Sequence, residues 1–497
     1  MIAVVLALLI VPLAAGIACA VRPARSAKAA SAVTVAAGIA CFALVLAMVP
    51  ATAHRDLSYL SYLRVDAVSV IFLLATSFLY AAVAVYAVGY LKRHEELYAR
   101  RFYAGLNLFA WSMLAAPMMS SLALLWIAVE VTTIISALLV AIEDTDGAAE
   151  AAWKYVLIAS AGLSLALLAT VLAYYAGSQV LGEHYNLAIA PLIQAGPHLP
   201  HTPVRLAFLL ALLGYGTKVG LFPVHTWLPD AHSEAPTPVS ALLSGSLLAV
   251  SFYAILRFYQ VTAATLGSGF PRDALLAFGI ASLLLAALYV FGQRDVKRLL
   301  AYSSVEHMGI LAIGVSFGAP VALAGVLLHV MAHAAAKGNA FMGAGVFTVK
   351  YGTKRMTAMR GGLGLLPWSG PLFLLAILAL SALPPFGVFR SEFQIVAGGL
   401  GSGSYAAAAV LVVLVTIAFF GLATSATSML MSPPQAQDKA QDRAQDRARS
   451  AGEPSAWMVV PVLAGLAVLV LLGVHPPGEL ADLITRGAAQ LRGSVTP

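Results

Sequence analysis

The chain has 497 residues, of which 61% are hydrophobic and only 10% are charged. A water-soluble domain carries roughly a quarter of charged residues, so this chain has too few to cover a soluble globule of its size. Its formal net charge is +7, but the Lys and Arg residues lie in short loops between apolar segments. Because they do not form aromatic-rich basic patches, nucleic-acid binding is excluded. The composition predicts an all-α membrane protein surrounded by lipid.

A helix that spans a bilayer needs roughly 20 mostly apolar residues. Segments of this kind recur along the whole chain and predict about fourteen transmembrane helices. The first has its positive residues after the apolar run, unlike a secretory signal, so we expect it to be retained. In chain order, the predicted helices cover residues 2–20, 30–50, 66–90, 104–119, 121–141, 153–175, 205–222, 238–258, 273–291, 299–316, 319–348, 369–389, 404–430 and 457–474.

The basic residues predict the orientation of this bundle. With an even number of spans both termini lie on one side, and eighteen Lys and Arg residues then fall on one face against eight on the other. The richer face is the cytoplasmic one, so we expect both termini on the outer face of the cell's inner membrane. The charged, Ala-rich segment 432–456 predicts a flexible or marginally helical cytoplasmic loop.

Ionisable residues occur inside the apolar segments, where each costs roughly 2.5–3.5 kcal/mol at the bilayer centre. Structural ion pairs would explain one or two such residues. A set spread over several helices fits a proton relay better, because a relay needs acids and bases within hopping distance. The residues are Glu130, Lys154, Lys218, Glu306, His307, His329, His333, Lys337 and Glu392.

One predicted helix carries three of these groups in register. His329, His333 and Lys337 are spaced by four residues and therefore lie along about 12 Å of a single helix face. Metal binding by the two histidines is a competing interpretation, but the nearby sequence offers no carboxylate or thiolate as a third ligand. The two cysteines form no CxxC pair, so we expect neither a zinc nor an iron–sulfur site.

Lys218 is the strongest single candidate for a residue that takes up and releases a proton. Desolvation lowers the pKa of a buried lysine and a carboxylate partner raises it, so movement of a partner can change its protonation. We expect Glu130 to be that partner. The helix of Lys218 is followed by four prolines, and a second break is predicted at Pro384-Pro385. Paired broken helices are typical of ion sites in inverted-repeat transporters.

His225 lies in the Pro-rich loop after Lys218, where we expect it to order the break or to accept protons from the cytoplasm. With Asp230 and His232 it imitates a catalytic cluster, which leaves a stand-alone membrane enzyme as a less favoured alternative.

Two groups of motifs resemble a known superfamily. KVGLFPVHTWLPDAHSEAPTPVSALLSG, together with the glutamate of LLWIAVEVTT, resembles the antiporter-like subunits of respiratory complex I, Mrp-type antiporters and membrane-bound hydrogenases, over roughly residues 60–430. RLLAYSSVEHMGI, HAAAKGNAF, KYGTKRM and LPPFGVFRSEF are most similar to the component F type of hydrogenase-4, which is related to formate hydrogenlyase.

The resemblance implies two inverted five-helix repeats with broken helices. It makes Glu130 and Lys218 an input pair, the His and Lys groups a central relay, and Glu392 the terminal residue. It also implies partner subunits, including one with nickel and iron–sulfur centres, while this chain carries no cofactor. The implied divisions are N-terminal helices in 1–103, repeats in 104–260 and 261–431, a loop in 432–456, and a last helix with a tail in 457–497.

One position departs from the family pattern. Relatives in complex I often carry a lysine in the eighth helix, where this chain has Ala249. The leading interpretation is a proton-translocating membrane subunit of a redox-driven complex. Two alternatives stay open: a cation/proton antiporter subunit of an Mrp-like assembly, which would move Na⁺ as well as protons, and a non-pumping scaffold for a peripheral oxidoreductase.

Overall fold

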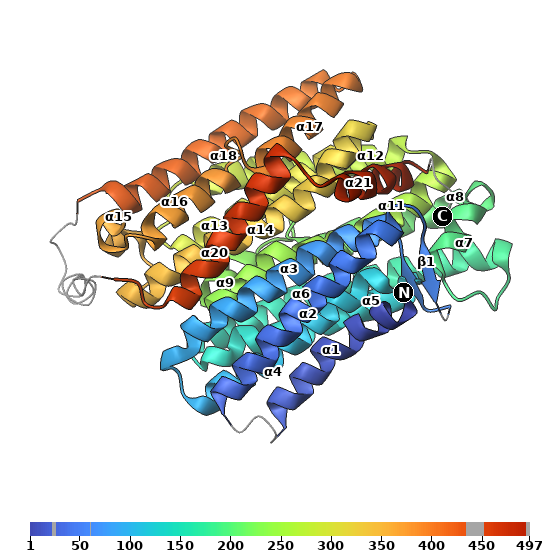
Figure 1. The fold of residues 1–497 in the computed structure, drawn as a ribbon. Coiled ribbons are helices and arrows are strands. Elements are labelled where there is room, and N and C mark those ends of the chain that lie inside the picture. Colours follow the sequence, from blue (N-terminus) through green and yellow to red (C-terminus); the bar gives the residue numbers. More distant parts are fainter. Residues whose placement is uncertain (22–25, 60, 434–451, 494–497) are drawn as a thin grey trace.

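The computed structural model describes residues 1–21, 26–59, 61–433 and 452–493 as a bundle of helices (Figure 1). The N-terminal helices lie on one side of the bundle and α16 to α18 on the other, with α9 to α14 between them (Figure 1). Strands β1 (Leu57–Tyr59) and β2 (Leu63–Val65) form an antiparallel hairpin that pairs Leu57 with Val65.

The α-helices have the following bounds: α1 (Ile2–Ala20), α2 (Ala27–Thr52), α3 (Ala67–Tyr90), α4 (Glu96–Ala115), α5 (Leu122–Val140), α6 (Asp146–Leu181), α7 (Ile189–Ala195), α8 (His201–Val219), α9 (Leu228–Glu234), α10 (Thr237–Leu242), α11 (Leu248–Leu266), α12 (Gly269–Tyr289), α13 (Val296–Phe317), α14 (Pro320–Tyr351), α15 (Gly362–Leu365), α16 (Ser369–Leu380), α17 (Gly387–Gly401), α18 (Tyr405–Met431), α20 (Ala456–Val474) and α21 (Gly478–Arg492). A π-helical turn, η5 (Leu243–Leu247), joins α10 to α11. Single 3-10 turns lie at η1 (Leu91–Arg93), η2 (Ala116–Met118), η3 (Ala141–Glu143), η4 (Gly196–His198) and η6 (Met356–Met359).

The all-α membrane architecture predicted from composition is confirmed. Within the described residues, 11 helices are long and apolar enough to cross a membrane. The helices α4, α8 and the α16–α17 pair fall outside that set. A count of fourteen requires these three to cross as well, so the exact number stays a prediction.

Local sequence explains where the main helices begin and end. Asp66, Ser121, Thr145 and Asp295 accept hydrogen bonds from backbone N–H groups in the first turns of α3, α5, α6 and α13. These donors have no partner within the helix, so each cap stabilises its helix start. At the end of α8, Gly220 has a φ of 81°, a left-handed conformation that suits glycine and terminates the helix.

Two helices are broken at the positions that the prolines predict. α8 ends before Gly220 and the chain resumes as α9, while α16 ends at Leu380 and the chain resumes as α17. The predicted span 369–389 ends too early, because α17 continues to Gly401 and carries Glu392. Non-helical backbone at membrane depth is tolerated only where protein or water satisfies its polar groups.

Corresponding helices of the two halves have corresponding neighbours. In the first half α6 packs against α5 and α8, and in the second half α14 packs against α13 and α17. Each half therefore places its broken helix beside the longest helix of that half. The boundary predicted between residues 260 and 261 falls inside α11, and the next interruption of helical structure is at Gly267 and Ser268; the division into two repeats stays a prediction.

The predicted C-terminal tail contains a further helix. Leu483, Ile484, Gly487 and Leu491 of α21 are buried, and this spacing places them on one face. That face packs against α14 and α3, so α21 lies across the end of the bundle where α1 also begins (Figure 1).

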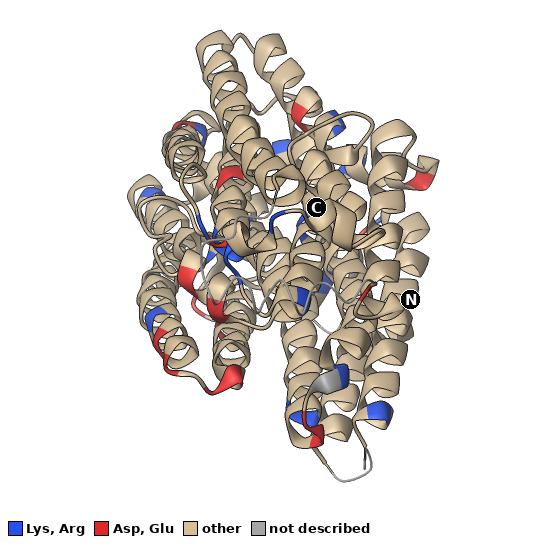
Figure 2. Ribbon diagram, turned by 90° about the vertical axis from the view of Figure 1, so that its left-hand side faces the viewer, with Lys and Arg blue, Asp and Glu red and all other residues tan. Residues whose placement is uncertain are grey.

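The opposite end of the bundle faces the viewer in Figure 2, where Lys, Arg, Asp and Glu gather on loops and helix ends while most of the ribbon is tan. Most of the charged loop predicted at 432–456 lies outside the described residues.

Candidate functional site

Lys218 is fully buried at the end of α8 and points at α5. Its Nζ donates hydrogen bonds to the backbone oxygen of Val129 at 2.8 Å, to Thr132 Oγ1 at 2.6 Å and to Thr133 Oγ1. These three acceptors match the three donors of an ammonium group. The lysine is therefore held by the helix that carries Glu130.

Glu130, the partner that the sequence predicts for Lys218, does not contact the lysine directly in this structure. No contact within 4.0 Å joins its carboxylate to Lys218 Nζ, although an electrostatic interaction links the two groups. Glu130 Oε2 is buried and has no hydrogen-bond partner among the described residues. Thr132 and Thr133 occupy the place expected for the carboxylate, so a direct pair requires a change of side-chain position.

Three histidines from two adjacent helices form a cluster in the second half. His307 of α13 and His329 and His333 of α14 are at most 1% exposed. His307 Nδ1 lies 3.1 Å from His329 Nε2, and the ring centroids of His307 and His333 are 5.1 Å apart. The cluster continues the helix face predicted from the spacing on α14 and adds a partner from α13.

α17 closes this cluster from the other side. Ser391 Oγ donates to the backbone oxygen of Val388 at 2.7 Å and lies 2.9 Å from His329 Nδ1. Since its only proton is used, Ser391 accepts from His329 Nδ1–H, which leaves the lone pair of His329 on Nε2. Glu392 Oε1 lies 3.9 Å from His307 Nδ1. His307, His329 and Glu392, which are 22 to 85 positions apart in the sequence, thus come together beside the break between α16 and α17.

Lys337 lies one turn beyond His333 and is fully buried. Its Nζ donates to the backbone oxygen of Leu300 on α13 at 2.8 Å. An electrostatic interaction links it to Glu306, whose Oε2 is buried and unpartnered among the described residues. The predicted group of Glu306, His307, His329, His333, Lys337 and Glu392 is therefore brought together between α13, α14 and α17.

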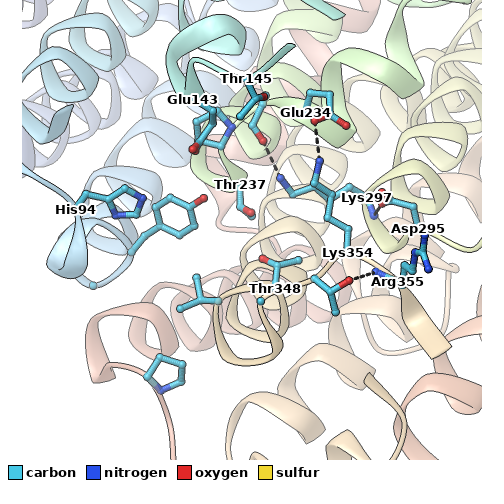
Figure 3. A pocket seen from close by; sticks show the side chains of 18 of the residues that line it. His94, Glu143, Thr145, Glu234, Thr237, Asp295, Lys297, Thr348, Lys354 and Arg355 are labelled. Atoms are coloured by element: carbon cyan, nitrogen blue, oxygen red, sulfur yellow. Dashed lines mark hydrogen bonds and ion pairs between the residues drawn. The ribbon is translucent and has the colours of Figure 1, made fainter. Parts of the chain in front are cut away.

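A cavity of about 730 Å³ opens at the loop-rich end of the bundle (Figure 3). Ion pairs and polar groups line it, among them Lys354, which contacts Glu234 at 2.9 Å. Lys297 also lines it and donates from Nζ to the backbone oxygen of Ala235 at 2.7 Å. The sequence places Lys297 among loop charges, but it is 4% exposed in the first turn of α13.

Lys297 therefore lies on the helix, α13, that also carries the acceptor of Lys337. On α13 it precedes Leu300, the acceptor of Lys337, by three residues, about 4.5 Å of helix rise.

Lys154 lies elsewhere than expected. Its side chain is 48% exposed on α6 and makes ion pairs with Glu150 at 2.6 Å and Asp230 at 3.4 Å. Arg298 also contacts Asp230 at 3.1 Å. The long helix α6 begins at Asp146, seven residues before the predicted span. Lys154 therefore belongs to a charged network near the start of the helix and not to the buried titratable residues.

Two histidines of the first break differ in burial. His225 is 8% exposed in the loop between α8 and α9, and its Nδ1 has no partner among the described residues. His232 is fully buried on α9, both of its ring nitrogens lack partners in that same part of the chain, and its ring stacks on Phe341 of α14. His232, treated in the sequence only as a possible catalytic residue, is the more deeply placed of the two.

Ala249 is buried in α11 just after the π-helical turn. No lysine is present here, but Ser244 of that turn lies 2.7 Å from Ser304 Oγ on α13, and Ser246 donates to Thr76 Oγ1 at 2.7 Å. A π-helical turn inside an α-helix is frequent at functional sites. Hydroxyl groups thus join this turn to α13 and to α3.

Comparison with known proteins gives the same fold. A family described as NADH:quinone oxidoreductase/Mrp antiporter, TM, matches residues 119–419. The "Hydrogenase-4 component F homolog" of Methylacidiphilum infernorum (isolate V4) is 36% identical over 363 residues, 72% of this chain and 76% of that protein. "NADH-quinone oxidoreductase subunit N" of Desulforudis audaxviator (strain MP104C) is 32% identical over 396 residues, 78% of this chain and 77% of that protein.

A solved structure extends the similarity over the whole chain. A chain of the Mrp complex from Dietzia sp. DQ12-45-1b superposes with a TM-score of 0.84 at 23% identity, covering 100% of this chain and 99% of that chain. At this level of identity the superposition establishes the fold, and the similar chain is part of the Mrp complex.

Proposed function

Because the chain belongs to the NADH:quinone oxidoreductase/Mrp antiporter transmembrane family, we propose that it translocates protons as a membrane subunit of a larger redox-driven assembly. The family membership confirms the resemblance that the HTWLPDAHSEAP motif predicts. The proposed assembly is of the hydrogenase-4 or complex I type, and its redox cofactors belong to partner subunits. This chain is an antiporter-like, multi-pass membrane subunit.

One observation carries the proposal: buried titratable side chains follow one another from the cavity to the second break. The row begins with Lys297, which lies on α13 at the cavity, and continues with Lys337, whose Nζ donates to Leu300 on the same helix. It then passes through the histidine cluster to Glu392. Water bridges steps longer than a hydrogen bond in such relays.

The row offers an answer to the missing lysine at Ala249. Its members all lie on α13, α14 and α17, so a path from the cavity to Glu392 does not need a titratable group on α11. The hydroxyl pair of Ser244 and Ser304 touches α13 within the same region. The row of titratable groups favours translocation over the scaffold alternative, because burying such groups is costly and a scaffold does not need them.

Lys218 is proposed as the switch that couples this row to the rest of the assembly. When Glu130 approaches, the ammonium form is favoured, and when Glu130 withdraws, desolvation favours release of the proton. The hydrogen bonds to Thr132 and Thr133 hold the lysine between these states. Moving one charge against 100 mV needs about 2.3 kcal/mol, which a redox step can supply.

We further propose that the cavity of Figure 3 faces the cytoplasm and that both termini lie outside. The excess of Lys and Arg in the loops at the cavity end supports this orientation.

The first test is purification of the chain with its companions in mild detergent, with mass spectrometry and metal analysis. A nickel- or quinone-linked large subunit with iron–sulfur partners supports the redox-driven assembly. Recovery of antiporter-type membrane subunits alone, without metal, favours cation/proton exchange.

Substitution of Lys218 by alanine then separates a pump from a scaffold. In proteoliposomes that contain the purified assembly, K218A is expected to lower proton uptake per electron by at least about tenfold, because the switch group is lost. Full coupled activity in K218A would identify the chain as a scaffold. The conservative variant Lys218→Arg keeps the charge but not the titration and is expected to fail as well.

A further inference from the structure

The ends of three side chains meet in the second break with the geometry of a metal site. His307, His329 and Glu392 each direct one nitrogen or oxygen atom to a common point, and these atoms lie within 4.8 Å of one another. We propose that this triad binds a divalent transition-metal ion of the zinc class. The proposal concerns binding alone and holds whether or not the chain moves protons.

The donor set matches zinc chemistry. Two imidazole nitrogens and one carboxylate form one of the three-ligand sets that hold zinc while leaving a fourth position open. The sequence argued against this site because no carboxylate stands near the histidines on their own helix. Folding supplies it from α17, 63 residues after His329.

The distances fit a zinc site after a side-chain movement of Glu392. Ligand atoms at 2.0–2.1 Å from a tetrahedral zinc ion are about 3.3 Å apart. His307 Nδ1 lies 3.1 Å from His329 Nε2 and 3.9 Å from Glu392 Oε1. The third separation, between His329 and the Glu392 carboxylate, is bounded by 4.8 Å, so Glu392 has to move up to about 1.5 Å toward His329 to meet the tetrahedral geometry, while the two histidines need almost no movement.

The lone pair of His329 is placed for metal binding, and that of His307 becomes available after a change of tautomer. His329 donates Nδ1–H to Ser391 Oγ, so its Nε2 is available to a metal. A ligating histidine ordinarily donates its other N–H to such an outer partner, which fixes the ring. His307 places its proton on Nδ1 when it donates to His329, and metal binding requires this proton to move to Nε2. That nitrogen is buried, and the backbone of Leu380 lies near the ring as a hydrogen-bond acceptor.

His333 lies beside the triad and offers a ring nitrogen as a fourth ligand. His333 is fully buried, and neither of its ring nitrogens has a partner among the described residues. Its ring centroid lies 5.1 Å from that of His307. A polar ring held in the protein interior without a partner is costly, and an ion or its bound water at the triad supplies that partner. Access is through Glu392, whose side chain is 11% exposed.

The test is a titration of the purified full-length chain, prepared without a histidine tag, with Co²⁺ as a coloured probe and Zn²⁺ as the competitor. The wild type is expected to show visible absorption of one tetrahedral Co²⁺ ion that Zn²⁺ displaces. His329→Asn and Glu392→Gln are expected to weaken binding at least about 100-fold. His225→Asn removes a histidine outside the triad and is expected to bind as the wild type does.

Ser391→Ala keeps all three ligands and removes only the outer hydrogen bond. We expect it to weaken Co²⁺ about 10- to 100-fold, and it serves as the second variant if a ligand substitution prevents folding. The proposal is wrong if the wild type binds no Co²⁺ at equimolar concentration, or if Glu392→Gln and Ser391→Ala both bind as tightly as the wild type. If the relay of the proposed function operates, bound Zn²⁺ also stops it, but the cobalt titration does not depend on that relay.

Discussion

The two halves of the bundle each place ionisable side chains beside a broken helix, but they satisfy those side chains differently. Lys218 uses all three of its donors on acceptors of α5. The histidine cluster leaves both nitrogens of His333 without partners in the described residues. A saturated group resists change until a neighbour moves, whereas groups with spare lone pairs exchange protons readily. We therefore expect the first half to hold its lysine until a neighbour moves, and the second half to pass protons along its row of buried groups, the proposed path.

The largest expected effect comes from the end of the path. Glu392→Ala removes the carboxylate beside His307, and a positioned acid or base contributes roughly 10²–10⁴-fold to proton transfer. We expect proton uptake by proteoliposomes of the assembly to fall by at least about 100-fold. Glu392→Asp is the control and is expected to retain part of the rate. An unchanged rate in Glu392→Ala would remove Glu392 from the path.

A smaller effect is expected from removing two of the three acceptors that hold Lys218. Thr132→Val together with Thr133→Val leaves Lys218 with the Val129 oxygen as acceptor. An unpaired buried donor costs about 1–3 kcal/mol, so the melting temperature measured in detergent is expected to fall. The matched control is Thr416→Val on α18, where an exposed hydroxyl bonds only to its own helix. Equal melting temperatures for the two variants would show that the threonines do not hold Lys218.

The smallest effect is expected at Lys154. Its half-exposed side chain pairs with Glu150 and Asp230 outside the buried row, and exposed ion pairs contribute little. Lys154→Met is expected to leave the proton-to-electron ratio of the purified assembly unchanged. A ratio that falls as far as in Glu392→Ala would return Lys154 to the relay that the sequence predicts.

The sequence predicts what depends on local chemistry. Apolar segments place the helices, prolines place both breaks, and four-residue spacing places His329, His333 and Lys337 on one face of α14. The glutamate and the lysine of the first half lie on α5 and α8, and the lysine side chain reaches α5.

The sequence does not predict contacts between distant segments. The meeting of Ser391 and Glu392 with His329 depends on how α17 packs against α14, which no spacing encodes. The threonine acceptors of Lys218 and the burial of Lys297 also depend on packing between distant segments. Hydropathy alone counts a basic residue such as Lys297, at the end of a helix, as a loop charge. The α21 helix was missed because its apolar residues are too few to resemble a membrane span, although their spacing is helical.

The most direct test of the proposed path is the number of protons moved per electron by the purified assembly in proteoliposomes, compared between wild type and Lys337→Met. Lys337 is fully buried and lies one turn from His333 on α14, so its loss removes a group that the proposed path requires. The exposed Lys28→Met variant is the control. We predict a ratio that falls sharply in Lys337→Met while electron transfer continues. A wild-type ratio in Lys337→Met would contradict a path through the second half.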